Sequence, residues 1–210
     1  MELTTAQSPQ TDAECTEAKT IPYQNVTGSL LYAAMATRPD IAFAVGVLCC
    51  FNSNHGQTHW TTAKRVMHYL KGMADLSIIY HQKATKSLDG TIAGIYDPEE
   101  MEGFTDADWA GDIETRKSTS GYIFTFAGGP ISWSSKAQVT LALSSTEAEY
   151  VSTTQAAQEA IYLRTLLSEL NLPPSSPTWL QCDNQSAISL TKSPIAHSRL
   201  KHIDIQHHFI

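Results

Sequence analysis

No stretch of this sequence is apolar over enough residues to cross a membrane. The longest apolar run, residues 41–51, has about half of the roughly 20 residues that a membrane-spanning helix needs. The pattern of a secretory signal peptide, basic residues followed by an apolar core, is also missing, because the first 20 residues are polar and include Asp12, Glu14 and Glu17. A membrane-spanning segment is therefore excluded, and we expect an intracellular protein.

Cysteine and basic residues are both scarce. The four cysteines, Cys15, Cys49, Cys50 and Cys182, have neither the spacing of a zinc knuckle nor the density of a disulfide framework, which favours a reducing environment. Lys and Arg total 14 against 21 for Asp and Glu, a formal charge of −7. This balance argues against a protein that binds nucleic acid by bulk electrostatic attraction, but it is compatible with one that meets phosphate through bound metal.

The first part of the chain has a helical pattern. With 210 residues, 42% of them hydrophobic, the chain is long enough for one domain, or for a domain with a smaller subdomain. Apolar positions recur every three to four residues between 23 and 51, which predicts two helices interrupted near Pro39. A further helix is expected from Thr58 to Gly72, and short strands are expected at residues 76–81 and 91–96.

The pattern changes after residue 102. Strands are expected at residues 103–108, 120–128 and 130–138, followed by a helix that begins at Ser144 or Ser145 and continues to Leu170. A fourth strand at residues 178–183 then leads into another helix at 184–193. Three antiparallel strands followed by a helix are typical of an α+β domain.

Acidic residues from three of these elements are expected to lie close together. Asp106 lies on the first strand, and Glu149, unlike Glu147, shares its helix face with the apolar residues that pack on the sheet. Asp183 ends the fourth strand, although Asp183 or Asn184 could equally be the N-cap of the next helix. Carboxylates that converge in this way favour a site for a hard cation such as Mg²⁺.

Long motifs in this second part resemble one known family. They read GFTDADWAGDIETRKSTSGYIFTFAGGPISWSSKAQ, ALSSTEAEYVSTTQAAQEAIYLRTLLSEL, LQCDNQSAISLTKSP and HSRLKHIDIQHHFI, and they are similar to the ribonuclease H domain of copia-type LTR retrotransposon Pol polyproteins. The earlier segment YQNVTGSLLYAAMATRPDIAFAVGVLCCFNSNHGQTHWTTAKRVMHYLKG resembles the end of the reverse transcriptase. The resemblance covers about residues 21–210 and implies an α+β or α/β fold, a ribonuclease H-like mixed sheet preceded by a mainly helical reverse-transcriptase connection segment.

The resemblance also implies a two-metal active site. In the family, carboxylates in the order Asp, Glu, Asp, Asp hold two Mg²⁺ ions, which Mn²⁺ can replace, and the first three match Asp106, Glu149 and Asp183. The fourth belongs to a motif beyond one further strand, and this sequence does not contain it. Asp204, the one late acid, matches a different part of the family pattern. We therefore expect a chain that lacks the last strand and helix of the fold and cleaves slowly or not at all.

Nucleic-acid contacts are implied by the same resemblance. The implied substrate is an RNA–DNA hybrid, which a protein distinguishes through its 2′-hydroxyl groups. Candidates for contacts to its backbone are Arg116, Lys117, Ser118 and Thr119, although these could equally be solvated loop residues. His202 is a candidate for proton transfer, whereas zinc binding by the late histidines has little support in their spacing.

The expected organisation has three parts: a disordered polar leader at 1–20, a helical reverse-transcriptase thumb or connection-like segment at 21–100, and a ribonuclease H-like domain at 101–210. The leading function is Mg²⁺-dependent hydrolysis of RNA in RNA–DNA hybrids. Alternatives are a noncatalytic remnant that binds nucleic acid or a partner, and an unrelated Mg²⁺-dependent nuclease. Expected partners are the reverse-transcriptase portion of the parent polyprotein and, through an open sheet edge, a second copy of the chain. The resemblance places the protein in a cytoplasmic virus-like particle or in the nucleus.

Overall fold

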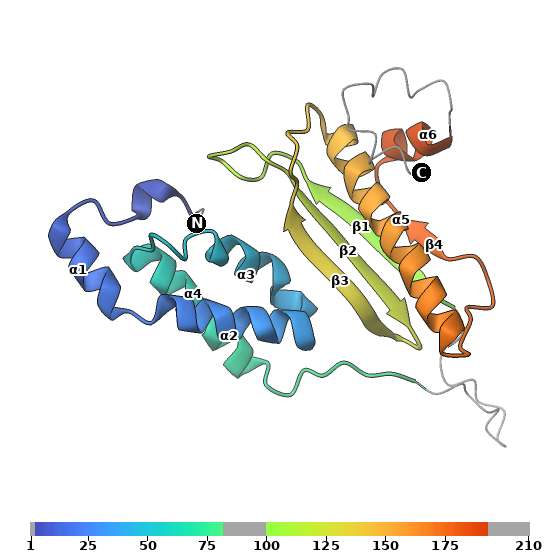
Figure 1. Cartoon of the computed structure of the whole chain (residues 1–210), viewed down its shortest axis with the longest axis horizontal. Coiled ribbons are helices and arrows are strands. Elements are labelled where there is room, and N and C mark those ends of the chain that lie inside the picture. Colours follow the sequence, from blue (N-terminus) through green and yellow to red (C-terminus); the bar gives the residue numbers. More distant parts are fainter. Residues whose placement is uncertain (1–2, 82–99, 193–210) are drawn as a thin grey trace. The chain divides into compact units, whose positions relative to one another are not determined.

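The computed structural model describes residues 3–81 and 100–192, and the chain divides into two compact units, Met1–Ser77 and Ile78–Ile210 (Figure 1). Residues 78–81 belong with the second unit, although the sequence places them in the helical segment. The reason is visible in their hydrogen bonds: the His81 N–H donates to the Ala127 carbonyl (2.7 Å), and the Tyr80 hydroxyl donates to that of Pro130 (2.7 Å). The expected boundary at residue 100 adjoins residues that lie outside the described part.

The first unit is helical. Its elements are η1 (Thr5–Gln7), α1 (Asp12–Thr20), α2 (Tyr23–Ala36), η2 (Pro39–Ile41), α3 (Ala42–Cys49) and α4 (Gln57–Gly72). The expectation of a disordered leader is corrected by α1, which a capping box stabilises. The Thr11 side chain accepts a hydrogen bond from the Glu14 N–H (3.3 Å), and the Glu14 carboxylate accepts one from the Thr11 N–H (3.1 Å). The His55 ring also contacts the Ala18 carbonyl (3.1 Å), which ties α1 to the loop before α4.

The core of this unit lies where α2, α3 and α4 meet. Its buried residues are Tyr23, Leu30, Ala34, Ile41, Val45, Leu48, Ala63 and Val66. Tyr23 is fully buried, donates its hydroxyl to the Leu48 carbonyl (2.9 Å) and stacks on His55 with ring centroids 4.4 Å apart. Burial raises the pKa of this phenol far above its usual range, and electrostatic repulsion from Cys49 and Cys50 adds to the effect. The helical period of the sequence therefore predicted the helices that build this core.

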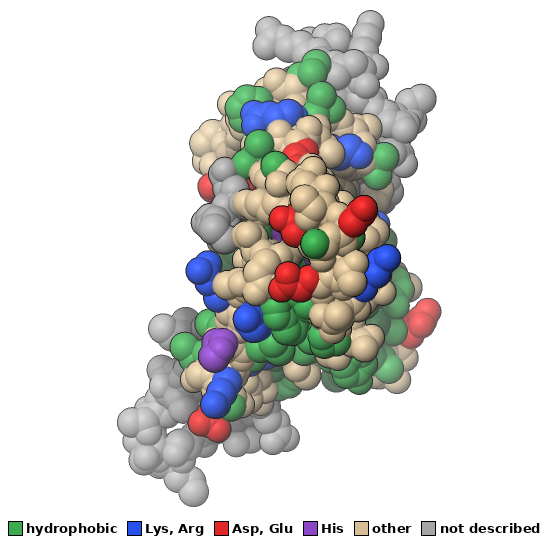
Figure 2. Space-filling view, turned by 90° about the vertical axis from the view of Figure 1, so that its left-hand side faces the viewer, with side chains coloured by type: hydrophobic (Ala, Val, Ile, Leu, Met, Phe, Trp, Pro, Cys, Tyr) green, Lys and Arg blue, Asp and Glu red, His purple; other side chains and the backbone are tan. Residues whose placement is uncertain are grey.

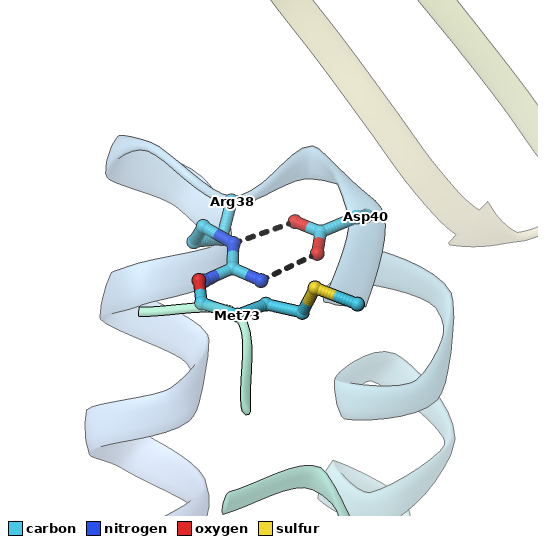
Figure 3. A network of polar contacts seen from close by, with 3 residues as sticks. All are labelled: Arg38, Asp40 and Met73. Carbon is cyan, nitrogen blue, oxygen red and sulfur yellow. Dashed lines mark hydrogen bonds and ion pairs between the residues drawn. The ribbon is translucent and has the colours of Figure 1, made fainter. Parts of the chain in front are cut away.

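A polar network closes this unit at the connection between α2 and η2 (Figure 3). The Arg38 guanidinium donates from Nε and Nη2 to the two carboxylate oxygens of Asp40 (2.9 and 2.7 Å), and from Nη1 to the Met73 carbonyl (3.2 Å). Since Met73 is the C-cap of α4, one side chain holds the α2–η2 connection against the end of α4. The hydrogen bonds from Arg38 lower the pKa of the Asp40 carboxyl.

The second unit is a mixed α+β structure of the kind found in ribonuclease H-like folds. Its strands β1 (Glu102–Asp108), β2 (Thr119–Phe126), β3 (Gly129–Ala137) and β4 (Trp179–Gln181) form one sheet in the order β3-β2-β1-β4. All neighbours are antiparallel except β1 and β4, which are parallel. Helices α5 (Ser145–Glu169) and α6 (Gln185–Lys192) complete the described part. The predicted fold class is thereby confirmed.

Two of the predicted strands fall elsewhere. Residues 76–81 form neither strand nor helix, and Leu76, Ile79 and Tyr80 are each more than half exposed. The strand prediction for this segment rested on its β-branched and aromatic residues, and these side chains are not buried against a sheet. The strand predicted at residues 91–96 lies outside the described residues.

Helix α5 lies across one face of the sheet (Figure 1). The core beneath it contains Met101, Phe124, Ala156, Leu163 and Leu167. On β1, Gly103 and Thr105 face this core, whereas Phe104, Asp106 and Asp108 alternate to the other side and are exposed. Among the described helices, none is long and apolar enough to cross a membrane.

Candidate metal centre

Asp106, Glu149 and Asp183 come from β1, from α5 and from the segment after β4. The last parallel pair joins Gln181 of β4 to Phe104 of β1. Asp183 lies two residues beyond Gln181, as Asp106 lies two residues beyond Phe104, and the charges of both acids raise the pKa of Glu149. Helix α5 supplies Glu149 from its first turns, where the helix contacts β1. The topology therefore brings the three predicted acids to one end of the sheet.

The carboxyl group of Glu149 is the buried member of this group. Its residue is 6% exposed, and the pKa is raised to about 7 by burial, by the negative charges of Asp106 and Asp183, and by a hydrogen bond with the Asp106 side chain. A hydrogen bond from the Ala107 N–H acts in the opposite direction. Acidic groups gathered so closely are a chemical fit for a divalent cation, whose charge would offset their mutual repulsion.

Glu147, two residues earlier, has a different role. Its carboxylate accepts a hydrogen bond from the Leu143 N–H (2.8 Å), and its own N–H donates to the Ser144 hydroxyl (3.2 Å), which makes it part of the N-terminal cap of α5. The sequence placed Glu147 away from the apolar helix face, yet it is 7% exposed and buried like Glu149. Periodicity distinguished the two glutamates, but it did not foresee that residues 147–154 of α5 are buried on every side.

The competing role of Asp183 as a helix cap is taken by its neighbour. The Asn184 side chain accepts a hydrogen bond from the Ala187 N–H (3.0 Å), and its carbonyl accepts the first helical bond, from the Ile188 N–H (3.0 Å). Asn184 is therefore the N-cap of α6. This arrangement leaves the Asp183 carboxylate on the side of Glu149, where one oxygen of each lies within 4.8 Å of the other.

Asp106 and Asp108 share a strand face but contact different partners. The Asp108 carboxylate occupies the space where a Cβ of Gly111 would lie, so it packs against the β1–β2 connection. Asp106 is held from behind by Ser152 of α5. The Ser152 hydroxyl donates to the Asp106 carbonyl (2.7 Å) and lies 2.9 Å from the Thr105 hydroxyl. The sequence contained no signal for Ser152 beyond its position three residues after Glu149.

The predicted nucleic-acid contacts lie in the β1–β2 connection and at the start of β2. Ser118 is fully buried, and its hydroxyl accepts a hydrogen bond from the Ala110 N–H (3.1 Å), so it supports the turn from within. Thr119 begins β2 opposite Asp108. Arg116 is exposed with a positive φ of 57°, and Lys117 is half-buried. Of the four candidates, the structure thus leaves Arg116 the most open to a ligand.

Asp112 stabilises the turn in the β1–β2 connection. Its carboxylate accepts hydrogen bonds from the Glu114 N–H (2.9 Å), from the Thr115 N–H (3.3 Å) and from the Thr115 hydroxyl. These bonds lower the pKa of the Asp112 carboxyl, and the charge of Lys117 adds to the effect. Asp112, the last residue of the TDADWAGD motif, therefore stabilises a turn in the described structure.

Cys182 joins the acidic group, a position that the sequence interpretation did not assign. Donor atoms of Glu149, Cys182 and Asp183 all lie within 4.8 Å of one another. The Cys182 Sγ lies 4.0 Å from Glu149 Oε2. The one available signal was its place directly before Asp183 at the end of a strand. His202 and Asp204, by contrast, lie outside the described residues.

Comparison with known proteins gives a consistent set of relatives. No protein-family model matches the chain, and no solved structure gives a significant match. The retrovirus-related Pol polyprotein from transposon TNT 1-94 of Nicotiana tabacum is 43% identical over 210 residues, 100% of this chain and 15% of that polyprotein. The one from transposon RE2 of Arabidopsis thaliana is 40% identical over 188 residues, 90% of this chain and 12% of that polyprotein. Secreted RxLR effector protein 161 of Plasmopara viticola is 46% identical over 145 residues, 69% of this chain and 93% of that protein.

Over most of its length this chain is homologous to the Pol polyproteins of copia-type retrotransposons. It spans only 12–15% of the length of the Pol polyproteins from TNT 1-94 and RE2. Because the match to the tobacco polyprotein covers all 210 residues, it includes every element that brings an acid to the candidate metal centre. The Pol relationship thus extends over both units of the chain.

Proposed function

We propose that this Pol chain is a ribonuclease H module that hydrolyses the RNA strand of RNA–DNA hybrids in the presence of Mg²⁺. The observation that carries the proposal is the convergence of Asp106, Glu149 and Asp183 from three separate elements, where burial and the charges of Asp106 and Asp183 raise the pKa of Glu149 to about 7. The charges of two exposed carboxylates beside a buried carboxyl disfavour its ionisation, and a perturbed acid in such a cluster supports a functional role.

Each residue has a defined part in the proposed reaction. Asp106, Glu149 and Asp183 would hold the cations, while Ser152 fixes the backbone of Asp106 and the Ala107 N–H orients the Glu149 carboxylate. Bound Mg²⁺ lowers the pKa of a water and stabilises the leaving oxygen of a phosphodiester. Exposed Arg116 would contact the hybrid backbone beside the site. The helices α2 to α4 would belong to the end of the reverse transcriptase of the parent polyprotein.

The test is cleavage of a labelled RNA–DNA hybrid by the 210-residue chain with Mg²⁺ and, separately, with Mn²⁺. Asp106→Asn and Asp183→Asn should each abolish cleavage. Asp108→Asn is the matched control, because it neutralises an acid of the same strand that packs on Gly111 instead of facing Glu149. Cleavage that survives Asp106→Asn and Asp183→Asn would overturn the proposed site.

A noncatalytic role is the second candidate, favoured by one observation. Within residues 3–81 and 100–192, the acids around Glu149 are Asp106 and Asp183, and a fourth carboxylate is not found with them. A chain that binds the hybrid in the presence of Mg²⁺ but leaves it intact would support this role. Substitution of Asp106 should then weaken hybrid binding without changing any cleavage rate.

A further inference from the structure

We propose that Cys182, Glu149 and Asp183 form a binding site for a thiophilic divalent cation of the Zn²⁺ class, and that this cation competes with Mg²⁺ for two shared carboxylates. The competition rests on the proposed function, whereas the binding of the thiophilic cation does not. The site differs from an all-carboxylate site by one sulfur donor, and that sulfur is what determines its preference.

The three donors already lie close to coordination geometry. All are within 4.8 Å of one another, and the Cys182 Sγ is 4.0 Å from Glu149 Oε2. A Zn²⁺ ion binds a thiolate at about 2.3 Å and a carboxylate oxygen at about 2.0–2.2 Å, so a small approach of the side chains is enough for one ion to contact all three. It is the one group of three such donors found within residues 3–81 and 100–192.

The local backbone explains how two consecutive residues reach the same ion. Strand β4 ends at Gln181, and α6 begins at Gln185 with Asn184 as its cap. Cys182 and Asp183 therefore lie in a connection where the side chains no longer alternate as they do along a strand. Glu149 approaches from α5 and is 6% exposed, so it supplies the desolvated side of the site.

Ligand chemistry decides which cation is preferred. Mg²⁺ prefers oxygen donors and gains little from sulfur, whereas a thiolate favours Zn²⁺ and Cd²⁺. On binding, the Cys182 thiol loses its proton to solvent and the sulfur becomes an anionic donor. Two carboxylates and one thiolate then surround the cation, which leaves one coordination position for water or a phosphate oxygen.

Occupation by Zn²⁺ would withdraw Glu149 and Asp183 from the Mg²⁺ site. Binding of a thiophilic metal would therefore inhibit the proposed ribonuclease activity. The Cys182 thiol would thus make the proposed nuclease sensitive to inhibition by Zn²⁺.

The test uses Cd²⁺ as the probe, because a cadmium thiolate absorbs in the ultraviolet and reports the Cd–S bond directly. The full 210-residue chain is titrated with Cd²⁺ beside Cys182→Ser and the matched control Cys50→Ser, which removes an exposed thiol that donates to the Gly46 carbonyl (3.5 Å). The native chain and Cys50→Ser should bind one Cd²⁺ with thiolate absorption at this site. Cys182→Ser should bind at least about tenfold more weakly and lose that absorption.

A second variant keeps the test decisive if Cys182→Ser is poorly folded by circular dichroism. Glu149→Gln retains the thiol and removes one oxygen charge, so its affinity for Cd²⁺ should fall by at least about tenfold while thiolate absorption still develops at saturation. The proposal is overturned if Cys182→Ser binds Cd²⁺ as the native chain does, or if the native chain develops no absorption attributable to Cys182.

Activity provides a separate arm. Zn²⁺ added with Mg²⁺ should inhibit hybrid cleavage by the native chain and by Cys50→Ser, and Cys182→Ser should require at least about tenfold more Zn²⁺ for the same inhibition. Equal inhibition of all three would overturn the competition. If none of the proteins cleaves the hybrid, the proposed function fails, and the cadmium titration still decides the thiol site.

Discussion

The environment of the Glu149 carboxyl disfavours its ionised form, and this should make the stability of the fold depend on pH. Its pKa is about 7 in the folded chain, against a value of 4.5 for an unperturbed glutamate. Between these two values the unfolded chain has released the proton while the folded chain retains it. The free energy of unfolding therefore falls as the pH rises from about 4.5 to about 7, and this contribution is constant above that range.

We expect Glu149→Gln to remove this decline. Urea unfolding between about pH 5 and about pH 8 should show stability falling with pH in the native chain and in the control Glu147→Gln, but not in Glu149→Gln. Saturating Mg²⁺ should also reduce the decline in the native chain, because the cation favours the ionised carboxylate. An identical pH profile for the native chain and Glu149→Gln would contradict the assigned environment.

Ser152 is a positioning residue, and its removal should affect metal binding more than folding. Ser152→Ala deletes the hydroxyl that bonds to the Asp106 carbonyl (2.7 Å) and lies 2.9 Å from the Thr105 hydroxyl. We expect a loss of about 1 kcal/mol in the free energy of unfolding and about tenfold weaker Mg²⁺ binding, measured by calorimetry. Ser152→Thr keeps a hydroxyl and should recover part of the affinity. Unchanged Mg²⁺ affinity in Ser152→Ala would show that the hydroxyl serves packing alone.

At the scale of elements, hydrogen bonds from Arg38 join the connection between α2 and η2 to the end of α4. Asp40→Asn removes the charge that pairs with Arg38 through two hydrogen bonds (2.9 and 2.7 Å). The pKa of Asp40 is lowered in the folded chain, so its stabilising contribution is present above the unfolded value of 3.8 and is lost as the pH falls through the folded value.

We therefore expect Asp40→Asn to cost about 1 kcal/mol at neutral pH and less in acid, as measured by thermal unfolding. The control is Asp75→Asn, an exposed acid in the same unit. Equal effects of the two substitutions would mean that the network contributes no more than an ordinary surface charge.

Elements with a strong local signal were predictable from the sequence. The cap at Ser144 and the apolar period of the following residues located α5, and the turn residues separated β1, β2 and β3. The same reasoning brought Asp106, Glu149 and Asp183 to one end of the sheet before any geometry was known. Their assignment as metal ligands stays a prediction.

Features that depend on contacts between distant segments were not predictable. Helix α1 has no buried residue, so hydrophobic pattern did not reveal it, and its capping box was the signal that mattered. Residues 76–81 had the composition of a strand but have no strand partner in the described structure. The approach of the Cys182 sulfur to Glu149 depends on how the chain leaves β4, which periodicity does not encode.

At the scale of the whole molecule, the net charge is negative, and this should determine how binding of an RNA–DNA hybrid depends on salt and on divalent cations. The formal charge is −7, and on the face shown in Figure 2 the Lys and Arg side chains are scattered among acidic ones without forming a continuous basic patch. We expect hybrid binding to depend strongly on divalent cations and only weakly on monovalent salt, unlike binding through a basic surface. Fluorescence anisotropy with and without a chelator measures both. A steep salt dependence that persists in the chelator would contradict a metal-mediated contact.

Sheet edges determine the expected behaviour of the molecule at high concentration. In the described sheet β3 forms one edge, and the other edge is β4, which pairs with β1 over three residues only. We expect self-association through an edge of this sheet. Size-exclusion chromatography with light scattering over a wide concentration range should show a rising molar mass, and a constant monomer mass would contradict it.

A tryptophan beside the candidate metal centre offers a fluorescence signal for cation binding. The indole of Trp109 follows β1 directly and donates from Nε1 to the Ala142 carbonyl (3.2 Å), in the segment that leads to the cap of α5. Because Trp109 lies three residues after Asp106 and its ring is half-exposed, we expect cation binding at Asp106 to change the environment of this ring. With Trp60, Trp133 and Trp179 replaced by phenylalanine, the emission of a single chromophore would follow the arrival of a cation in real time, without a label and without a substrate.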